Sequence, residues 1–247
     1  HFSPRAYLVY NALDSLTIKG GVNRGFRAPR LNDLAKGISG ITKQGTEISY
    51  GNPNLKPETS TNTELGFLFN NQQGIAASLT FFHNEIEDRI SSGGDCAVNQ
   101  ISSCGDSKVG TYQINIDEAK TWGAEVTASF LLPANLDLSL NYTWTDSEIK
   151  EKGEKNGKLG NLPKHLANAT LRWQAAEDLS LFLRGNYRGD ARRFNGDYAK
   201  LTGDEKRAND AVGDIKAYFL FDLGAAYKVT QDIAITATVT NLLNKDF

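Results

Sequence analysis

The sequence lacks any long run of apolar residues. Its apolar runs, such as residues 130–132, fall far short of the roughly 20 apolar residues that a helix needs to cross a bilayer. A transmembrane strand needs only about 9–11 residues, and only every second one has to be apolar. The missing runs therefore argue against a membrane-spanning helix but not against a β-barrel, and a hydrophobic content of 40% fits a barrel or a soluble protein equally.

The chain also lacks an excess of charge of either sign. Its 27 Lys and Arg residues nearly balance its 29 Asp and Glu residues, for a net charge of -2. This balance does not suggest nucleic-acid binding, which usually needs a basic surface. The N-terminus, residues 1–4, lacks the basic and apolar regions of a signal peptide, so we expect the chain to come from the interior of a longer protein.

Cysteine and histidine are scarce. Cys96 and Cys104 lie in a stretch rich in Gly, Ser and Asp, which favours a loop disulfide formed in an oxidising compartment over two free thiols. A metal site made of cysteine alone would need four ligands and no histidine is near in sequence, so we predict no metal site. No Ser/His/Asp set has a motif around it and no Gly-rich loop opens a helix, so we expect no enzyme activity.

What the sequence does have is alternation with a period of two residues. From Leu136 to Thr145 every second residue is apolar and every intervening one is polar, which indicates a strand rather than a helix. The same pattern recurs and predicts ten strands, at residues 3–13, 15–28, 59–70, 74–91, 111–132, 135–149, 164–175, 178–193, 215–229 and 232–244.

The connections between these strands alternate in length. Short turns, such as residues 133–135, alternate with long polar segments at 29–58, 92–110, 150–163 and 194–214. Short turns at one end and long loops at the other are typical of outer-membrane barrels, in which the turns are periplasmic and the loops extracellular.

A secreted β-sandwich is the main structural alternative. Sandwich strands usually have about 5–6 residues, and aromatic residues near strand ends, such as Tyr142, Trp144 and Trp173, suit interfacial girdles instead. Charges that would be costly in a dry core but natural in a wet lumen are Glu64, Glu125, Arg172, Arg184 and Asp222. We therefore predict an all-β fold, an antiparallel transmembrane β-barrel. Ten strands would leave two open edges in lipid, so we expect a fragment of a larger barrel.

Two motifs flank the first long loop. Residues 25–29, Gly-Phe-Arg-Ala-Pro, end the second predicted strand, and residues 51–60, Gly-Asn-Pro-Asn-Leu-Lys-Pro-Glu-Thr-Ser, lead into the third. With Gly123-x-Glu125 and the ending at residues 241–247, these boxes make the chain resemble the TonB-dependent outer-membrane receptors over essentially its whole length. The resemblance is closest to the colicin I receptor group and its catecholate-siderophore relatives.

The resemblance implies a plugged barrel of about 22 strands, energised by the TonB complex of the inner membrane. The predicted strands would then be the twelfth to the twenty-first, so that residues 1–247 form the C-terminal part of the barrel. The plug, the TonB box and the last strand would lie outside this chain. Independently of the resemblance, Pro29, Pro53 and Pro57 would stop strand pairing beside the loop, and Glu58 would fix the entry of the third strand by accepting hydrogen bonds. In that interpretation both boxes are scaffold that shapes the base of the loop; the alternative is that residues within them contact a ligand.

The resemblance also bears on the cargo. In haem receptors of this family a histidine between the two boxes binds the haem iron, and residues 30–51 contain none, although Tyr50 leaves a tyrosinate route open. An iron–siderophore complex is commonly anionic, which suits Arg and Lys with aromatic residues. We therefore predict TonB-dependent uptake of a ferric siderophore of catecholate type, with no covalently bound cofactor. The predicted ligand contacts are Arg27, Arg30, Lys43, Tyr50, Arg188, Arg192, Arg193, Phe194 and Tyr198; the alternative is that they are solvated loop charges or contacts to lipopolysaccharide.

Other functions are compatible with the same sequence. One alternative is the same barrel importing haem, cobalamin or a saccharide. A second is a passive porin, which would lack the plug and the TonB box. A third is a soluble β-sandwich binding module, which would not partition into detergent. The expected partners of a receptor are the ferric siderophore, the TonB complex, outer-membrane lipid and lipopolysaccharide, together with colicins or phages that exploit such receptors.

Overall fold

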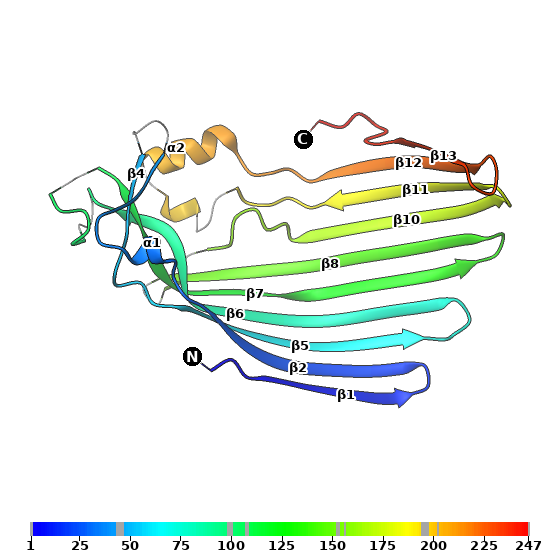
Figure 1. Cartoon of the computed structure of the whole chain (residues 1–247), viewed down its shortest axis with the longest axis horizontal. Coiled ribbons are helices and arrows are strands. Elements are labelled where there is room, and N and C mark those ends of the chain that lie inside the picture. The colour runs from blue at the N-terminus through cyan, green and yellow to red at the C-terminus, as the bar shows by residue number, and fades with distance from the viewer. Residues whose placement is uncertain are drawn as a thin grey trace.

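The structure, a computed structural model, describes residues 2–42, 47–97, 101–106, 109–151, 154–155, 157–193, 198–201 and 203–246. Within them, strands that follow one another in the chain pair antiparallel in a single sheet, in chain order, as in an up-and-down barrel wall (Figure 1). The strands of this path are β1 (Arg5–Leu13), β2 (Leu16–Arg27), β5 (Glu58–Asn70), β6 (Ile75–Asp95), β7 (Thr111–Leu132), β8 (Leu136–Glu151), β10 (His165–Ala176), β11 (Leu179–Arg188), β12 (Tyr218–Lys228) and β13 (Ala234–Val239).

The predicted all-β antiparallel fold is confirmed, and most strand bounds agree within a few residues. Three predicted strands were too long. The strand expected at 178–193 ends at Arg188, and beyond it an isolated bridge joins Ala191 to Ile215. The strand expected at 215–229 begins at Tyr218, and the one expected at 232–244 is confined to Ala234–Val239.

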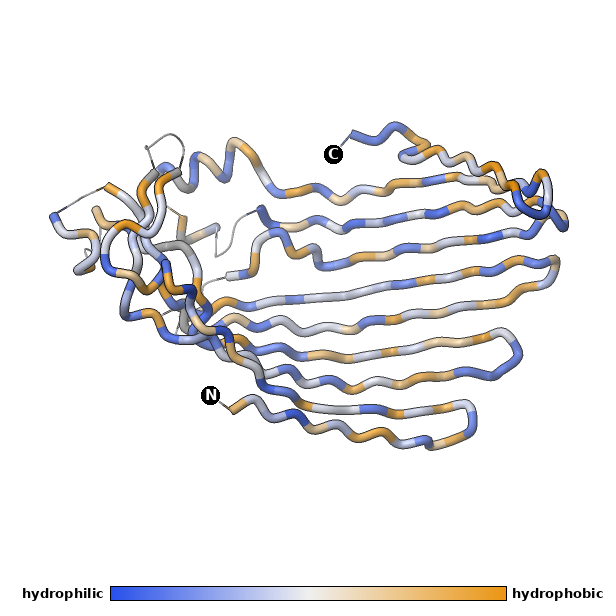
Figure 2. The backbone as a smooth tube through the Cα atoms, in the orientation of Figure 1, coloured by the Kyte–Doolittle hydropathy of each residue, from blue (hydrophilic) through white to orange (hydrophobic). Residues whose placement is uncertain are grey.

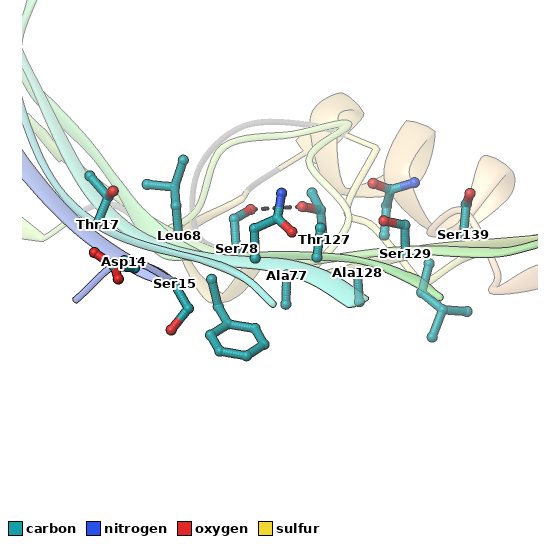
Figure 3. A pocket seen from close by; sticks show the side chains of 15 residues that line it. Asp14, Ser15, Thr17, Leu68, Ala77, Ser78, Thr127, Ala128, Ser129 and Ser139 are labelled. Atoms are coloured by element: carbon teal, nitrogen blue, oxygen red, sulfur yellow. Dashed lines mark hydrogen bonds between the residues drawn. The ribbon is translucent and has the colours of Figure 1, made fainter. Parts of the chain in front are cut away.

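The register keeps the two faces of the sheet chemically different. Tyr142 on β8 lies between Val126 and Ala167, whereas its neighbour Asn141 lies between Thr127 and Asn168 on the other face. Figure 2 shows the resulting alternation of hydrophilic and hydrophobic residues along the strands. Near the turns, Figure 3 shows Ser78 and Thr127 joined by a 2.7 Å hydrogen bond on one face, while Ala77 and Ala128 point the opposite way.

The apolar face is not covered by any other part of the described chain. Tyr142, Trp173 and Phe219 on this face are 40%, 44% and 56% exposed. The polar face carries charges that match across strands, with Arg184 opposite Asp222 and Arg172 Nη1 3.8 Å from Asp137 Oδ1. The sheet therefore has no apolar core between two layers, as a sandwich would have.

The long loops contain short elements that the sequence did not predict. The first loop holds α1 (Leu31–Leu34), β3 (Ile38–Thr42) and β4 (Glu47–Tyr50), and the others add β9 (Glu154–Lys155), η2 (Tyr198–Lys200) and α2 (Gly203–Val212). All of them lie at the end of the sheet away from the short turns (Figure 1). In the part of the chain that the structure describes, neither helix has the length and apolar character needed to span a membrane.

Candidate ligand-binding loops

The first loop is anchored to the wall by the box at residues 51–58. Asn52 Nδ2 donates to Gln113 O at 3.0 Å, and Asn52 N donates to Asp33 O at 2.5 Å. The Asn115 side chain forms two hydrogen bonds with the Lys56 backbone: its Oδ1 accepts from Lys56 N at 2.8 Å, and its Nδ2 donates to Lys56 O at 3.0 Å. These contacts hold the loop against β7, as expected for a scaffold.

The two boxes also meet directly. Glu58 Oε2 lies 3.0 Å from Arg27 Nε, and Glu58 Oε1 accepts from Arg27 Nη2 at 3.1 Å and from Ile90 N at 2.6 Å. The prediction that Glu58 accepts hydrogen bonds at the entry of its strand is confirmed. Arg27 therefore has a structural partner, although its side chain is still 67% exposed.

A small core joins the first loop to the second. Cys96 and Cys104 form the predicted disulfide, and both belong to one buried cluster with Tyr50 and Tyr112. Strand β4 pairs in parallel with β7 at the same place, Tyr50 being opposite Tyr112. Burial, and secondarily the Asp95 carboxylate, raise the pKa of the Tyr112 phenol. Tyr50 is only 8% exposed, which argues against its predicted contact with a ligand.

A second group of loops is connected through backbone carbonyls. Arg188 Nη2 donates to Asn161 O at 3.1 Å, and Arg193 Nε donates to Gly213 O at 3.2 Å. Asn161 N in turn donates to Arg192 O at 2.6 Å. Arg188 and the Arg192 carbonyl thus join the loop before β10 to the end of β11 and the loop that follows it, whereas Arg193 holds that loop together internally, roles that the sequence did not indicate.

Tyr198 belongs to the same group of loops. Its hydroxyl donates to Asp210 Oδ1 on α2 at 2.6 Å, and Lys206 Nζ lies 5.3 Å from its ring centroid. The hydrogen bond to Asp210 raises the pKa of the Tyr198 phenol, which therefore remains neutral at physiological pH. Lys43 and Phe194, also predicted contacts, lie outside the described residues.

Two polar cavities lie at this end of the sheet. One of about 430 Å³ lies at the base of the first loop, and Arg27 and Arg30 both line it with Asp33 and Gln113. The other, of about 190 Å³, is lined by Arg192 with Lys158, Lys164 and three aspartates. Of the predicted site residues, Arg27 and Arg30 line the first cavity and Arg192 lines the second, whereas Tyr50, Arg188, Arg193 and Tyr198 line neither.

Comparison with known proteins decides what this architecture is. The family model described as "TonB dependent receptor-like, beta-barrel" matches residues 1–242. The chain belongs to this family. Its sheet is accordingly part of an outer-membrane barrel wall, with the apolar face toward lipid, the polar face toward the lumen and the long loops outside the cell. The family is one of receptors and transporters rather than of enzymes.

Curated relatives of this barrel segment carry several names. It is 39% identical over 249 residues to the iron-regulated outer membrane virulence protein of Vibrio cholerae serotype O1, a match covering 100% of this chain and 36% of that protein. The ferric enterobactin receptor of Pseudomonas aeruginosa is 31% identical (99% and 33% covered), and the vitamin B12 transporter BtuB of Photobacterium profundum is 30% identical (96% and 33% covered). The chain spans about a third of the length of these relatives.

Solved structures agree on the fold. A mutant ferric enterobactin receptor of P. aeruginosa in complex with enterobactin superposes with a TM-score of 0.71 at 26% identity, covering 98% of this chain and 35% of that one. The siderophore receptor PirA of Acinetobacter baumannii gives a TM-score of 0.73 at 23% identity, over 98% of this chain and 37% of that one, and supports the fold alone.

Proposed function

We propose that the protein is a receptor for TonB-dependent uptake of a ferric siderophore of catecholate type, which it binds in its extracellular loops. The observation that carries the proposal is the cavity at the base of the first loop, where Arg27 and Arg30 line one space of about 430 Å³. An anionic chelate is matched by two guanidinium groups, which form strong charge-assisted hydrogen bonds with oxygen acceptors. The names of the relatives from V. cholerae and P. aeruginosa support an iron cargo.

Arg27 and Arg30 have different roles in this site. Arg27 is oriented by Glu58, whose carboxylate fixes the guanidinium at the cavity wall. Arg30 stands at the start of α1, three residues beyond, and reaches the same cavity from the loop. Binding outside would be relayed to the plug and the TonB complex, as in the family mechanism that the sequence resemblance implies.

The test uses the whole receptor that contains this segment, produced in cells that lack their own siderophore receptors. Binding and uptake of iron-labelled ferric catecholate and ferric hydroxamate are measured beside cyanocobalamin and haem, with TonB present or deleted. Arg30→Gln removes one cavity charge, and Arg207→Gln on the exposed helix α2 is the matched control, because Arg207 pairs with Asp204 and lines neither cavity.

We expect saturable binding of the ferric catecholate and uptake only when TonB is present. Losing one charge-assisted hydrogen bond costs about 1.5–3 kcal/mol, so Arg30→Gln should weaken binding about 10-fold or more, while Arg207→Gln leaves it unchanged. Tight binding of cyanocobalamin with no iron chelate bound would refute the proposed cargo and make the BtuB relative the better guide. Uptake that does not need TonB would refute the active mechanism.

A further inference from the structure

An apolar groove of about 430 Å³ lies open on the lipid-facing side of the wall. Its floor includes three small residues, Ala167 and Ala169 of β10 and Gly185 of β11. Larger side chains rise on both sides, namely Leu140 and Tyr142 from β8, and Tyr187, Phe219 and Phe221 from β11 and β12.

The sheet register explains why a groove forms here. Ala169 is paired with Leu140 on one side and Gly185 on the other, and Ala167 is paired with Tyr142 and Tyr187. Paired strands lie about 4.8 Å apart, so the backbones of β8 and β11 are separated by about 10 Å across β10. That width accommodates one hydrocarbon chain in van der Waals contact with both walls.

The walls are formed before any ligand arrives. The rings of Tyr187 and Phe219 have centroids 4.5 Å apart, and those of Phe219 and Phe221 are 6.4 Å apart. On the opposite wall, the Tyr142 hydroxyl and His165 Nδ1 are hydrogen-bonded at 2.8 Å, which holds the Tyr142 ring in place. A rigid groove loses little conformational entropy when it is filled, so binding there is more favourable than on a mobile surface.

The position of the groove determines what fills it. Because this face contacts the bilayer, the occupant is a membrane lipid rather than a soluble ligand. Trp144, paired with His165, marks the extracellular end of the apolar band, and Trp173 marks the other end of β10. Ala167 is two residues from His165, and Ala169 is midway between His165 and Trp173, so the groove lies in the outer half of the apolar band. It therefore adjoins the outer leaflet, whose lipid in such membranes is lipopolysaccharide.

We propose that this groove binds one acyl chain of lipopolysaccharide at a defined place on the barrel wall. The chain lies over Ala167 and Ala169, between the Tyr142 ring and the aromatic wall around Phe221. The polar atoms of Tyr142 and His165 stand at the extracellular rim, where the headgroup begins. The site is independent of the cargo bound in the loops.

The test measures retained lipid by native mass spectrometry of the receptor containing this segment, purified in mild detergent and incubated with lipopolysaccharide or dipalmitoyl phosphatidylethanolamine. Ala169→Phe and the milder Ala167→Leu fill the groove floor. The matched control is Ala237→Phe on β13, a lipid-facing alanine that does not line the groove.

We expect the unchanged receptor and Ala237→Phe to retain one lipopolysaccharide molecule, and both groove variants to retain at least about fivefold less. Equal retention by all four proteins would overturn the proposal, as would phosphatidylethanolamine retained as well as lipopolysaccharide. Retention of a second protein copy instead of lipid, abolished by Ala169→Phe, would also overturn it. If Ala169→Phe does not assemble, Ala167→Leu decides.

Discussion

Arg27 and Glu58, 31 residues apart in the sequence, form a two-bond ion pair across the directly paired strands β2 and β5. The same carboxylate accepts the Ile90 amide of β6, so one side chain joins three consecutive strands where the first loop leaves the wall. The Glu58 side chain is only 14% exposed, which makes these bonds stronger than those of a surface ion pair.

Glu58→Ala is expected to loosen the base of the first loop. It leaves the Ile90 amide without its acceptor, a loss of about 1–3 kcal/mol for a buried donor. The measurement is the rate at which an added protease cleaves residues 28–57 in the assembled receptor. Glu87→Ala is the control, because Glu87 is 57% exposed and its partner Arg24 is 3.7 Å away, so we expect a change below about 1 kcal/mol. Equal cleavage of the two variants would show that Glu58 does not anchor the loop.

Replacing both Cys96 and Cys104 by serine is expected to release two loops at once. The bond closes a loop with a sequence separation of 8 residues, which the chain-entropy model values at about 2.5 kcal/mol. Hydrogen exchange at the amide of residue 96, which donates to Gly110 O, should accelerate, and exchange along β4 should accelerate with it. Ser102→Ala in the same loop is the control. If hydrogen exchange along β4 is as slow in the double variant as in the unchanged protein, the two loops do not share a core.

Arg193→Lys separates a structural role from a charge contact. Lysine keeps the positive charge but cannot place a donor as Arg193 Nε does on Gly213 O. We expect Arg193→Lys and Arg193→Gln to expose the loop before β12 to protease equally, while the nearby exposed Lys216→Gln has no effect. If Arg193→Lys is cleaved like the unchanged protein while Arg193→Gln is cleaved faster, the charge of Arg193 matters rather than its hydrogen bond to Gly213. Arg193 would then again be a predicted charge contact for the ligand.

Gly123→Ala is expected to impair assembly of the wall. A Cβ atom at this position would collide with the Trp144 carbonyl oxygen and lie 2.8 Å from the Phe82 ring. Overpacking of this kind typically costs about 1–3 kcal/mol. The yield of heat-modifiable, folded barrel in the outer membrane measures the effect. Gly40→Ala, where nothing lies within 4 Å, is the control, and normal yields from both variants would show that the sheet adapts.

The sequence predicted the strands well because alternation is a local property that each strand carries by itself. Leu136 to Thr145 indicate a strand without reference to any partner. The ends depend on partners: β6 runs on to Asp95 because it pairs with Thr111, and β11 stops early because only an isolated bridge, Ala191 with Ile215, continues beyond it. Helix α2 was missed because its ten residues carry no apolar stripe.

The site is less predictable from the sequence, because residue type alone does not determine whether a side chain is exposed. Tyr50 sits among polar neighbours in the sequence, yet its burial comes from Cys96 and Tyr112, which no local pattern contains. The charge of Arg188 and Arg193 predicts contacts to an anionic ligand, whereas in the structure both side chains donate to backbone carbonyls. Asn52 and Asn115 anchor the first loop, and only the proline-rich box around Asn52 had hinted at such a role.

The shared core of Tyr50, Tyr112 and the disulfide has a consequence for how such receptors can diverge. We expect that the first two loops cannot be exchanged separately between relatives, because one loop transplanted alone would lack the residues of the other loop against which it packs. We therefore expect a functional graft of this part of the barrel to carry residues 28–57 and 92–112 together.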